Sequence, residues 1–401
     1  MNRFDQTKNI GNFFAGLLSV PLRIHKAIFA SQKIDLSPSG VKRILLIKFW
    51  GIGNITTLLP VIKEISLRYS DSEVYFLTLD SNKGLLDNSP YVSKVLYLPL
   101  TTHIGKIAVE TLRHLFIIRR LNIDLLINFE QCNKMSVIFC YLTGSRGRVG
   151  FSLPSRNYNS LYTASIYNDP TLHVSRNFIN LARVAGVAID KYIYVPPYIE
   201  KESMEKAENV VSRYSLGNKR FAVFHIGSGE NFIGKRWHHY NFSRLADYLI
   251  YRFDINVVYT GKGKERGIIE SALSAMRLKA LNFCDYFTIQ EFIAFVKKSY
   301  LFVGNDSGPL HIAAAMGVNT VGIYGPMNPV QYGSLAENSL SLYKPIGCNP
   351  CLTDLNNKTS LCSRSRCLDM ITAEEIIEKV SEKFFKDDTS VLNLKDDYER
   401  Y

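Results

Sequence analysis

The chain lacks several features that would place a protein of 401 residues in a simple class. It has no stretch of about 18 apolar residues free of charge, so the sequence predicts no membrane-spanning helix. It has no cleavable signal that ends in an Ala-x-Ala site, so we expect no secretory leader. It also has no Lys/Arg tract and no RNA-binding signature, which argues against nucleic acid as the partner.

The composition is that of a globular, basic protein. Hydrophobic residues make up 46% of the chain and charged residues 21%, a balance that excludes general disorder. The length suffices for two domains of ordinary size. Lys and Arg number 48 against 36 Asp and Glu, which leaves a net charge of +12. Such an excess suits an anionic partner, either a nucleotide or a lipid head group.

Residues 1–40 form an apolar and basic segment. Between residues 10 and 34, large apolar side chains are interspersed with Arg23, Lys26 and Lys33, and Pro21 interrupts the pattern. A helix lying on an anionic membrane surface fits this mixture. A helix packed on the core of the first domain fits it as well, because apolar stripes are usually core. The sequence leaves both interpretations open.

Apolar runs alternate with helical patterns in two successive halves of the chain. This alternation predicts an α/β protein with mostly parallel sheets, covered by helices on both faces. We expect two facing, doubly wound, Rossmann-like domains at residues 41–195 and 196–384, with a cleft between them and a polar tail at 385–401. The predicted strands are 41–48, 74–79, 95–98, 124–129, 221–226, 255–260, 301–304 and 320–325.

The most informative motif spans residues 305–317, between two apolar runs, and reads as a strand, a polar turn and a short helix of small residues. The N-terminus of such a helix presents N–H groups that suit a phosphate. Asp306 and Ser307 could bind ligand hydroxyls or only cap the helix. Ser307 and His311 are four residues apart and share a helix face. We interpret this turn, with Gly308, as a ligand site.

The chain resembles glycosyltransferase family 9, the heptosyltransferases of bacterial lipopolysaccharide assembly, from about residue 41 to residue 384. The resemblance implies the glycosyltransferase-B fold and an inverting transfer from a nucleotide-diphospho-sugar, with ADP-heptose as the leading donor. It also implies a lipid-linked saccharide acceptor at the cytoplasmic face of the inner membrane, hence peripheral contact with an anionic membrane surface. Four segments carry the resemblance: 44–48 with Gly51, Gly53, Asn54 and Pro60; 225–229 with 235–237; 258–261 with Glu265; and 305–308 with His311, Gly317 and Pro326.

The chemistry of such a transfer assigns roles to these residues. Negative charge grows on the leaving phosphate and must be stabilised. No Asp-x-Asp metal clamp is present, so we expect catalysis by protein donors without a metal cofactor. Lys235 is predicted to contact phosphate, although it could be a solvated lysine, and Glu265 to bind ribose, although it could complement a helix dipole. The expected donor-binding residues are Gly51, Gly53, Ser228, Gly229, Lys235, Glu265, Asp306, Ser307, Gly308 and His311.

The chain departs from the family at the catalytic position, where Asn54 stands in place of the Asp that is the proposed general base. An amide has no useful basicity, so Asn54 cannot take the proton of the acceptor. Another carboxylate after a strand, Glu130 or Asp80, could serve, or a dissociative transition state could move the proton late. The chain could also bind a nucleotide-sugar or glycan without catalysis. We favour Glu130, although a surface carboxylate is its simpler interpretation.

Four of the seven cysteines follow the pattern Cys-x2-Cys-x10-Cys-x4-Cys at Cys348, Cys351, Cys362 and Cys367. This spacing resembles a small zinc or iron knuckle, whose role would be structural because four thiolates leave no open position. Free thiols are the alternative, and disulfides are disfavoured in a reducing cytoplasm.

Overall fold

The computed structural model describes residues 36–99, 104–131, 133–152, 156–229, 234–353, 360, 362 and 365–386. The segment at residues 10–34 and most of the polar tail, for which the sequence makes predictions, lie outside these residues. Within them, no helix has the length and apolar character that a membrane span requires.

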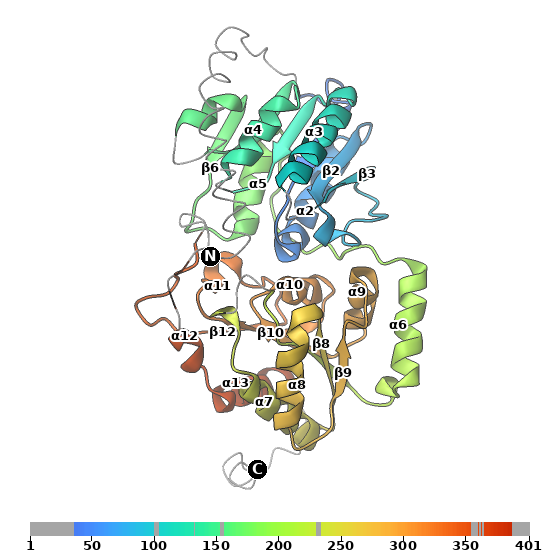
Figure 1. Cartoon of the computed structure of the whole chain (residues 1–401), viewed down its shortest axis with the longest axis vertical. Helices are drawn as coiled ribbons and strands as arrows, with labels where there is room; N and C mark the ends of the chain where they lie inside the picture. The colour runs from blue at the N-terminus through green and yellow to red at the C-terminus, as the bar shows by residue number, and fades with distance from the viewer. Residues whose placement is uncertain are drawn as a thin grey trace.

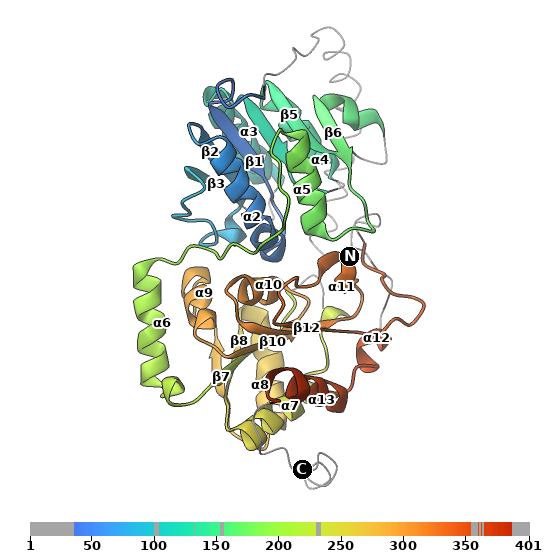
Figure 2. The same ribbon diagram turned by 180° about the vertical axis from the view of Figure 1, so that it is seen from behind.

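The first half folds around a six-stranded parallel sheet with the strand order β3-β2-β1-β4-β5-β6. The strands are β1 (Arg43–Ile47), β2 (Glu73–Leu79), β3 (Lys94–Leu98), β4 (Leu125–Asn128), β5 (Gly147–Ser152) and β6 (Ala164–Tyr167). Alternate strand residues face opposite sides, so each face has its own hydrophobic core. Helices α2 (Ile52–Arg68) and α5 (Val174–Val184) cover one face, and α3 (Ile104–Arg120) and α4 (Lys134–Leu142) cover the other (Figures 1 and 2).

The second half repeats this architecture with the order β12-β11-β10-β7-β8-β9, again entirely parallel. Its strands are β7 (Phe221–His225), β8 (Asn256–Gly261), β9 (Leu281–Cys284), β10 (Leu301–Asn305), β11 (Asn319–Tyr324) and β12 (Ser339–Tyr343). One face packs on α7 (His239–Phe253), α8 (Arg266–Ala275) and α13 (Ala373–Phe384). The other packs on α6 (Lys201–Arg213), α9 (Ile289–Lys297) and α10 (Gly308–Ala315). The shorter helices are η1 (Asp80–Asn82), η2 (Arg156–Leu161), η3 (Leu216–Asn218), η5 (Gly263–Glu265), α11 (Pro329–Tyr332) and α12 (Arg366–Asp369).

The predicted α/β, doubly wound architecture is confirmed. All eight predicted strands are present, and β5, β6, β9 and β12 complete the two sheets. The expected domain boundary at residues 195–196 lies between α5 and α6, in a segment without helix or strand. One prediction was wrong: the sequence predicts a glycine-rich turn at residues 49–54 and a helix from Leu58, whereas helix α2 already begins at Ile52. The first turn of the helix includes Gly53, whose position is fixed by a neighbouring helix described below.

Each sheet has one point at which the strand order reverses, between β1 and β4 in the first and between β7 and β10 in the second. Loops that follow the strands at such a point diverge and leave room for a ligand. Helix α2 follows β1, and α10 follows β10, so the N-terminus of each helix marks the carboxyl edge of its sheet. These two helices contact each other, and the two carboxyl edges therefore face one another.

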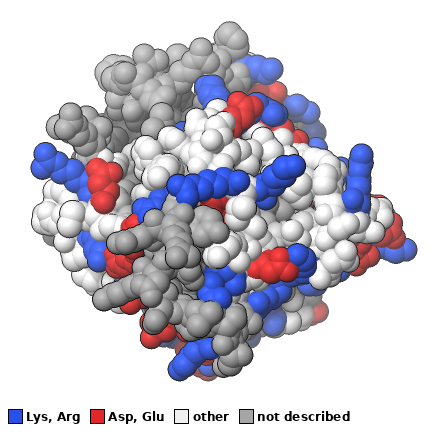
Figure 3. Space-filling model, turned by 90° about the horizontal axis from the view of Figure 1, so that it is seen from below, with Lys and Arg blue, Asp and Glu red and all other residues white. Residues whose placement is uncertain are grey.

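The two halves also share polar and apolar contacts. Gln290 Nε2 donates to the Gly84 carbonyl oxygen at 2.6 Å, and His173 Nε2 lies 2.9 Å from the Gly333 carbonyl oxygen. Ile293 and Ile312 of the second half belong to the same hydrophobic cluster as the α2 and α5 core of the first. Figure 3 shows basic side chains interspersed with acidic ones on the face seen from below.

Candidate functional site

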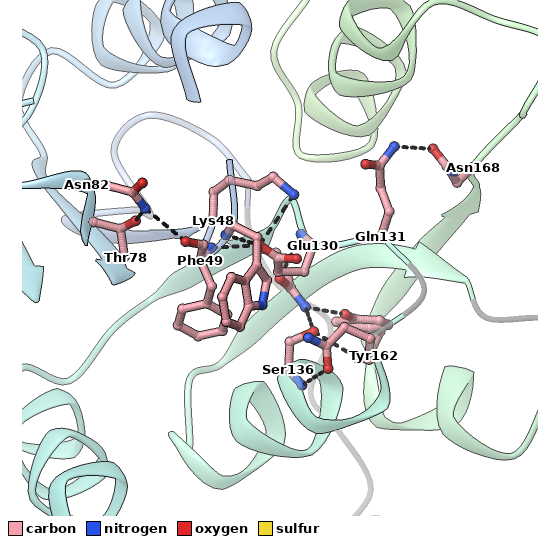
Figure 4. Close-up of polar contacts among 12 residues, drawn as sticks. Lys48, Phe49, Thr78, Asn82, Glu130, Gln131, Ser136, Tyr162 and Asn168 are labelled. Atoms are coloured by element: carbon pink, nitrogen blue, oxygen red, sulfur yellow. Dashed lines mark hydrogen bonds and ion pairs between the residues drawn. The ribbon is translucent and has the colours of Figure 1, made fainter. Parts of the chain in front are cut away.

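A buried ion pair occupies the point of strand-order reversal in the first sheet. Lys48 follows β1 and Glu130 follows β4, and these two strands pair directly. Lys48 Nζ lies 3.3 Å from Glu130 Oε1, and both side chains are at least 95% buried. The same oxygen accepts hydrogen bonds from the backbone N–H groups of Phe49 at 2.6 Å and Trp50 at 3.1 Å (Figure 4). The interpretation of Glu130 as a surface carboxylate was therefore wrong.

The other carboxylate oxygen of Glu130, Oε2, receives no hydrogen bond from any described residue. The backbone of Glu130 is fixed as well, because its N–H donates to Asn128 Oδ1 at 3.1 Å. Asn128 is itself held, since its Nδ2 donates to Ser136 Oγ at 2.9 Å and to the Tyr162 hydroxyl at 2.7 Å (Figure 4). The result is a carboxylate with a fixed orientation and one oxygen without a partner.

The glycine-rich segment after β1 brings Asn54 into the contact between the two halves. Gly51 has a φ of 89°, which favours glycine, and it precedes the first turn of α2. A Cβ added to Gly53 would lie 2.5 Å from His311 Cδ2, so the two helix N-termini meet without room for a side chain. Asn54 is half-buried, and its side chain makes no hydrogen bond with a described residue. Asp80, the other candidate base, is exposed at the end of β2.

A second buried ion pair occupies the corresponding point of the second sheet. Lys235 Nζ lies 2.5 Å from Asp306 Oδ2 and donates to the Asp306 carbonyl oxygen at 3.3 Å. Both side chains are about nine-tenths buried. The interpretation of Lys235 as a solvated surface lysine was therefore wrong, and its ammonium group lies at the turn between β10 and α10.

Buried polar atoms without hydrogen-bond partners cluster at this turn. Asp306 Oδ2, Ser307 Oγ and His311 Nδ1 are buried and form no hydrogen bond with a described residue, although Oδ2 contacts Lys235 as an ion pair. Ser307 is the N-cap residue of α10, yet its side chain does not cap the helix. The interpretation of this residue as a simple cap was therefore wrong. Unpaired buried polar atoms are rare in native proteins, which makes this turn a candidate binding site.

His311 is neutral in this environment. The pKa of its imidazole is lowered to about 4, mainly by burial; the Asp306 carboxylate opposes this shift, and His173 and Lys235 add to it. A neutral imidazole can accept or donate one hydrogen bond through the unpaired Nδ1.

Glu265 holds the loop after β7 in this structure. Its Oε1 accepts a hydrogen bond from the Gly229 N–H at 3.2 Å, and its Oε2 accepts one from the Lys262 N–H at 2.9 Å. Its carboxylate also lies against Gly227, where an added Cβ would be 1.8 Å from Oε1. Ser228 is buried beside this loop and accepts from Arg236 Nε at 3.3 Å. Glu265 therefore stands beside Ser228 and Gly229, as the prediction of a shared donor site requires.

Two residues that the sequence analysis did not select also shape the site. Lys48 is the first, and a charge that directly follows the apolar run at residues 44–47 is a signal that could have identified it. Asn305 is the second: it is fully buried, its Oδ1 accepts from the Trp237 N–H at 2.9 Å, and its Nδ2 donates to the Ile226 carbonyl oxygen at 2.8 Å. Asn305 thus ties together the two segments that carry Ser228 and Lys235.

The four clustered cysteines form no disulfide among the described residues. Burial raises the pKa of the Cys367 thiol to about 11, and the nearby Cys351 and Cys348 add to this rise. Among the described residues, no group of three or more His, Cys, Asp or Glu side chains is arranged to hold a metal ion.

Comparisons with known proteins find similar sequences and similar folds. The sequence model of glycosyltransferase family 9 (heptosyltransferase) matches residues 112–361. The chain is 25% identical to lipopolysaccharide heptosyltransferase 1 of Campylobacter coli, over 85% of this chain and 99% of that protein. A family 9 glycosyltransferase structure from Veillonella parvula is similar with a TM-score of 0.72 and 19% identity, covering 89% of this chain and 99% of that one. The structure of the Escherichia coli ADP-heptose lps heptosyltransferase II is similar with a TM-score of 0.68 and 18% identity, covering 87% of this chain and 100% of that one.

Proposed function

The chain belongs to glycosyltransferase family 9, the heptosyltransferases, and from this premise we propose that it transfers heptose from ADP-heptose, with inversion, to a lipid-linked saccharide. The donor is supported by the similarity to the Escherichia coli ADP-heptose enzyme, and a lipopolysaccharide acceptor by the Campylobacter coli relative. The net charge of +12 suits both a diphosphate and an anionic membrane face.

One observation carries this proposal: the N-termini of α2 and α10 meet where Gly53 contacts His311. Asn54 is the next residue of α2, and Glu130 holds the loop that leads into that helix. Lys235 and Asp306 hold the turn that leads into α10. Acceptor-side and donor-side groups therefore belong to one continuous contact, as a direct transfer between two substrates requires.

The donor half of the reaction uses cationic and backbone groups. The Lys235 ammonium and the N-terminus of α10 stabilise the diphosphate as negative charge develops on the leaving oxygen. Ser307 Oγ and His311 Nδ1, which lack partners in the described structure, bind donor oxygens, and Glu265 accepts from the ribose hydroxyls. In this arrangement the protein's own hydrogen-bond donors and the Lys235 ammonium group stabilise the leaving group.

The acceptor half of the reaction uses Glu130 as the general base. The acceptor hydroxyl oxygen attacks the anomeric carbon, the bond from that carbon to the diphosphate oxygen breaks, and the hydroxyl proton passes to Glu130 Oε2. Lys48 and the N–H groups of Phe49 and Trp50 occupy Oε1, which leaves Oε2 as the acceptor of the proton. Asn54 donates a hydrogen bond to the incoming hydroxyl and orients it.

A second candidate function is binding of a nucleotide-sugar without transfer. Asn54 favours it, because the amide replaces the family's proposed base. The ion pair between Lys48 and Glu130 also favours it, because a carboxylate held in a buried pair can be purely structural. The two functions differ in turnover and not in donor affinity.

The test follows release of ADP and formation of product from ADP-heptose, with UDP-, GDP- and dTDP-sugars as controls and a lipid-extract acceptor. We expect Glu130→Gln to lower kcat by roughly 10²- to 10³-fold, the range for loss of a general base. Its affinity for ADP-heptose should stay within about twofold of the wild type, since a base that contacts only the acceptor adds little to binding of the donor. Asp80→Asn is the matched control and should keep the wild-type rate.

Two outcomes would contradict parts of this proposal. Equal rates for Glu130→Gln and the wild type would assign the proton to another acceptor. Tight donor binding by a wild type that transfers nothing to any acceptor would establish the non-catalytic function, and Asn54→Asp would then test whether the missing carboxylate is the cause.

A further inference from the structure

Helix α3 exposes an apolar stripe on the side that faces away from its sheet. Leu115 and Ile118 bury the inner side of the helix in the core. On the outer side, Val109 is 63% exposed, Leu112 66% and Phe116 57%. These three residues are spaced three and four positions apart, so they form one continuous row on the helix surface. Contiguous exposed apolar residues often mark an interaction site, whereas single scattered ones are normal on a protein surface.

Basic side chains flank this row. Lys106, Arg113 and Arg120 are spaced seven residues apart and therefore lie along one edge of it. All three are exposed, and the Arg120 guanidinium lies 4.1 Å from the centre of the Phe116 ring. The acidic residue of this helix, Glu110, is partly neutralised, because its carboxylate lies 3.6 Å from Arg113 Nη1. The outer face of α3 thus combines aliphatic, aromatic and cationic groups.

We propose that the outer face of α3 docks on an anionic lipid bilayer. A helix that lies in the membrane interface buries an apolar row of Leu, Val and Phe among the acyl chains and directs Lys and Arg toward anionic head groups. A protein partner would need complementary acidic groups and a matching groove. A fluid anionic surface needs neither, and it complements both the row and its basic edge.

The position of α3 relates this surface to the candidate site. The helix follows β3, whose carboxyl end lies at the same edge of the sheet as Lys48 and Glu130. Helix α3 covers the face of the first sheet opposite to α2 (Figures 1 and 2). A bilayer on this face would meet the half of the molecule to which acceptor binding is assigned. The proposed docking surface consists only of described residues of α3. The proposal is therefore independent of whether the chain transfers heptose.

The experiment measures binding of the full chain to vesicles by flotation. One set of vesicles contains phosphatidylethanolamine and phosphatidylglycerol, and the other contains phosphatidylcholine alone. The test variant is Leu112→Ser with Phe116→Ser, and a second variant, Lys106→Glu with Arg113→Glu, tests the charged edge. The matched control is Val330→Ser with Met370→Ser, which removes side chains that are 66% and 58% exposed on the second half. A chain without residues 1–35 separates α3 from the N-terminal segment.

We expect the wild type to prefer the anionic vesicles, and Leu112→Ser with Phe116→Ser to lower its partition by about tenfold, because two apolar anchors are lost. The charge variant should lose the preference for anionic lipid, and the control variant should bind as the wild type does. Unchanged donor binding in all variants shows that they are folded. Wild-type vesicle binding by both α3 variants would overturn the proposal, as would loss of all binding on removal of residues 1–35 alone. A wild-type dimer that Leu112→Ser with Phe116→Ser converts to a monomer would assign the face to a second copy.

Discussion

His311 is a buried titratable residue at the contact between the two sheets, and its Nδ1 has no hydrogen-bond partner among the described residues. Its pKa, lowered by burial to about 4, lies well below that of an exposed histidine. The unfolded chain therefore binds a proton at a higher pH than the folded chain does. This difference links the stability of the protein to pH.

We predict that the free energy of unfolding falls as the pH is lowered from 7 to 5. Stability from a neutral buried His311 is fully present above the unfolded pKa and is lost as the pH falls toward the folded value, at a cost of about 2 kcal/mol over this range. The pKa of His173 is also lowered by burial and acts in the same direction. Urea denaturation at several pH values measures the effect.

The variant His311→Gln is the control for this prediction, because it keeps a polar side chain that cannot titrate. Its stability should depend less on pH than that of the wild type. If the two show the same slope, His311 is not the group responsible, and His173 or His225 becomes the candidate.

Individual site residues were predictable where they follow a strand. Glu130, Asp306 and Glu265 follow β4, β10 and β8, and carboxyl ends of parallel strands share an edge of the sheet. Their partners were not predictable, because Lys48 and Glu130 pair only when β1 lies beside β4, a matter of strand order. The burial of Lys235 was not predictable for the same reason. Its sequence context does not distinguish it from a surface lysine, and only the fold places Asp306 next to it.

At the scale of elements, most strands rich in Val, Ile, Leu and Phe were predictable, whereas the edge strands β6, β9 and β12 and the internal strand β5 were not. Strands β1 and β10 are almost fully buried, and their apolar runs are continuous. Strand β6 alternates between partly buried and exposed residues and is only four residues long. A short edge strand is specified by pairing with its neighbour more than by its own sequence. The same limit applies to α2, whose first turn depends on contact with α10.

The segment that carries the cysteine pattern is the element whose chemistry remains a prediction. We expect the purified chain to carry about one equivalent of zinc or iron in a structural role, since closed cysteine sites typically bind one such ion. Metal analysis by mass spectrometry measures this, and Cys351→Ser should lose the metal while Cys284→Ser, at a half-buried cysteine outside the pattern, retains it. Four titratable thiols and no bound metal in the wild type would contradict the prediction and leave the cysteines as free thiols.

At the scale of the whole molecule, two similar sheets become one functional unit through a narrow contact. Helix α2 of the first half meets α10 of the second, and the cluster that contains Ile312 and Ile293 extends the first core across the boundary. Hydrogen bonds from Gln290 Nε2 to the Gly84 carbonyl oxygen and from His173 Nε2 to the Gly333 carbonyl oxygen add polar links. Two domains joined in this way can close on substrates and reopen, with their relative position set by few side chains.

Gly53 tests this contact directly, because an added methyl group would lie 2.5 Å from His311 Cδ2. We predict that Gly53→Ala lowers the free energy of unfolding by about 1 to 3 kcal/mol, the usual cost of overpacking a well-packed core. It should also lower the transfer rate, because Asn54 and Asp306 are pushed apart. The control is Gly267→Ala in α8, where an added Cβ meets no atom within 4 Å. That change should be neutral or stabilising by up to about 1 kcal/mol, since alanine is the better helix former. Equal stability and equal rates for Gly53→Ala and the wild type would mean that the two helices do not touch in solution, and the site would then have to be assembled by substrate binding.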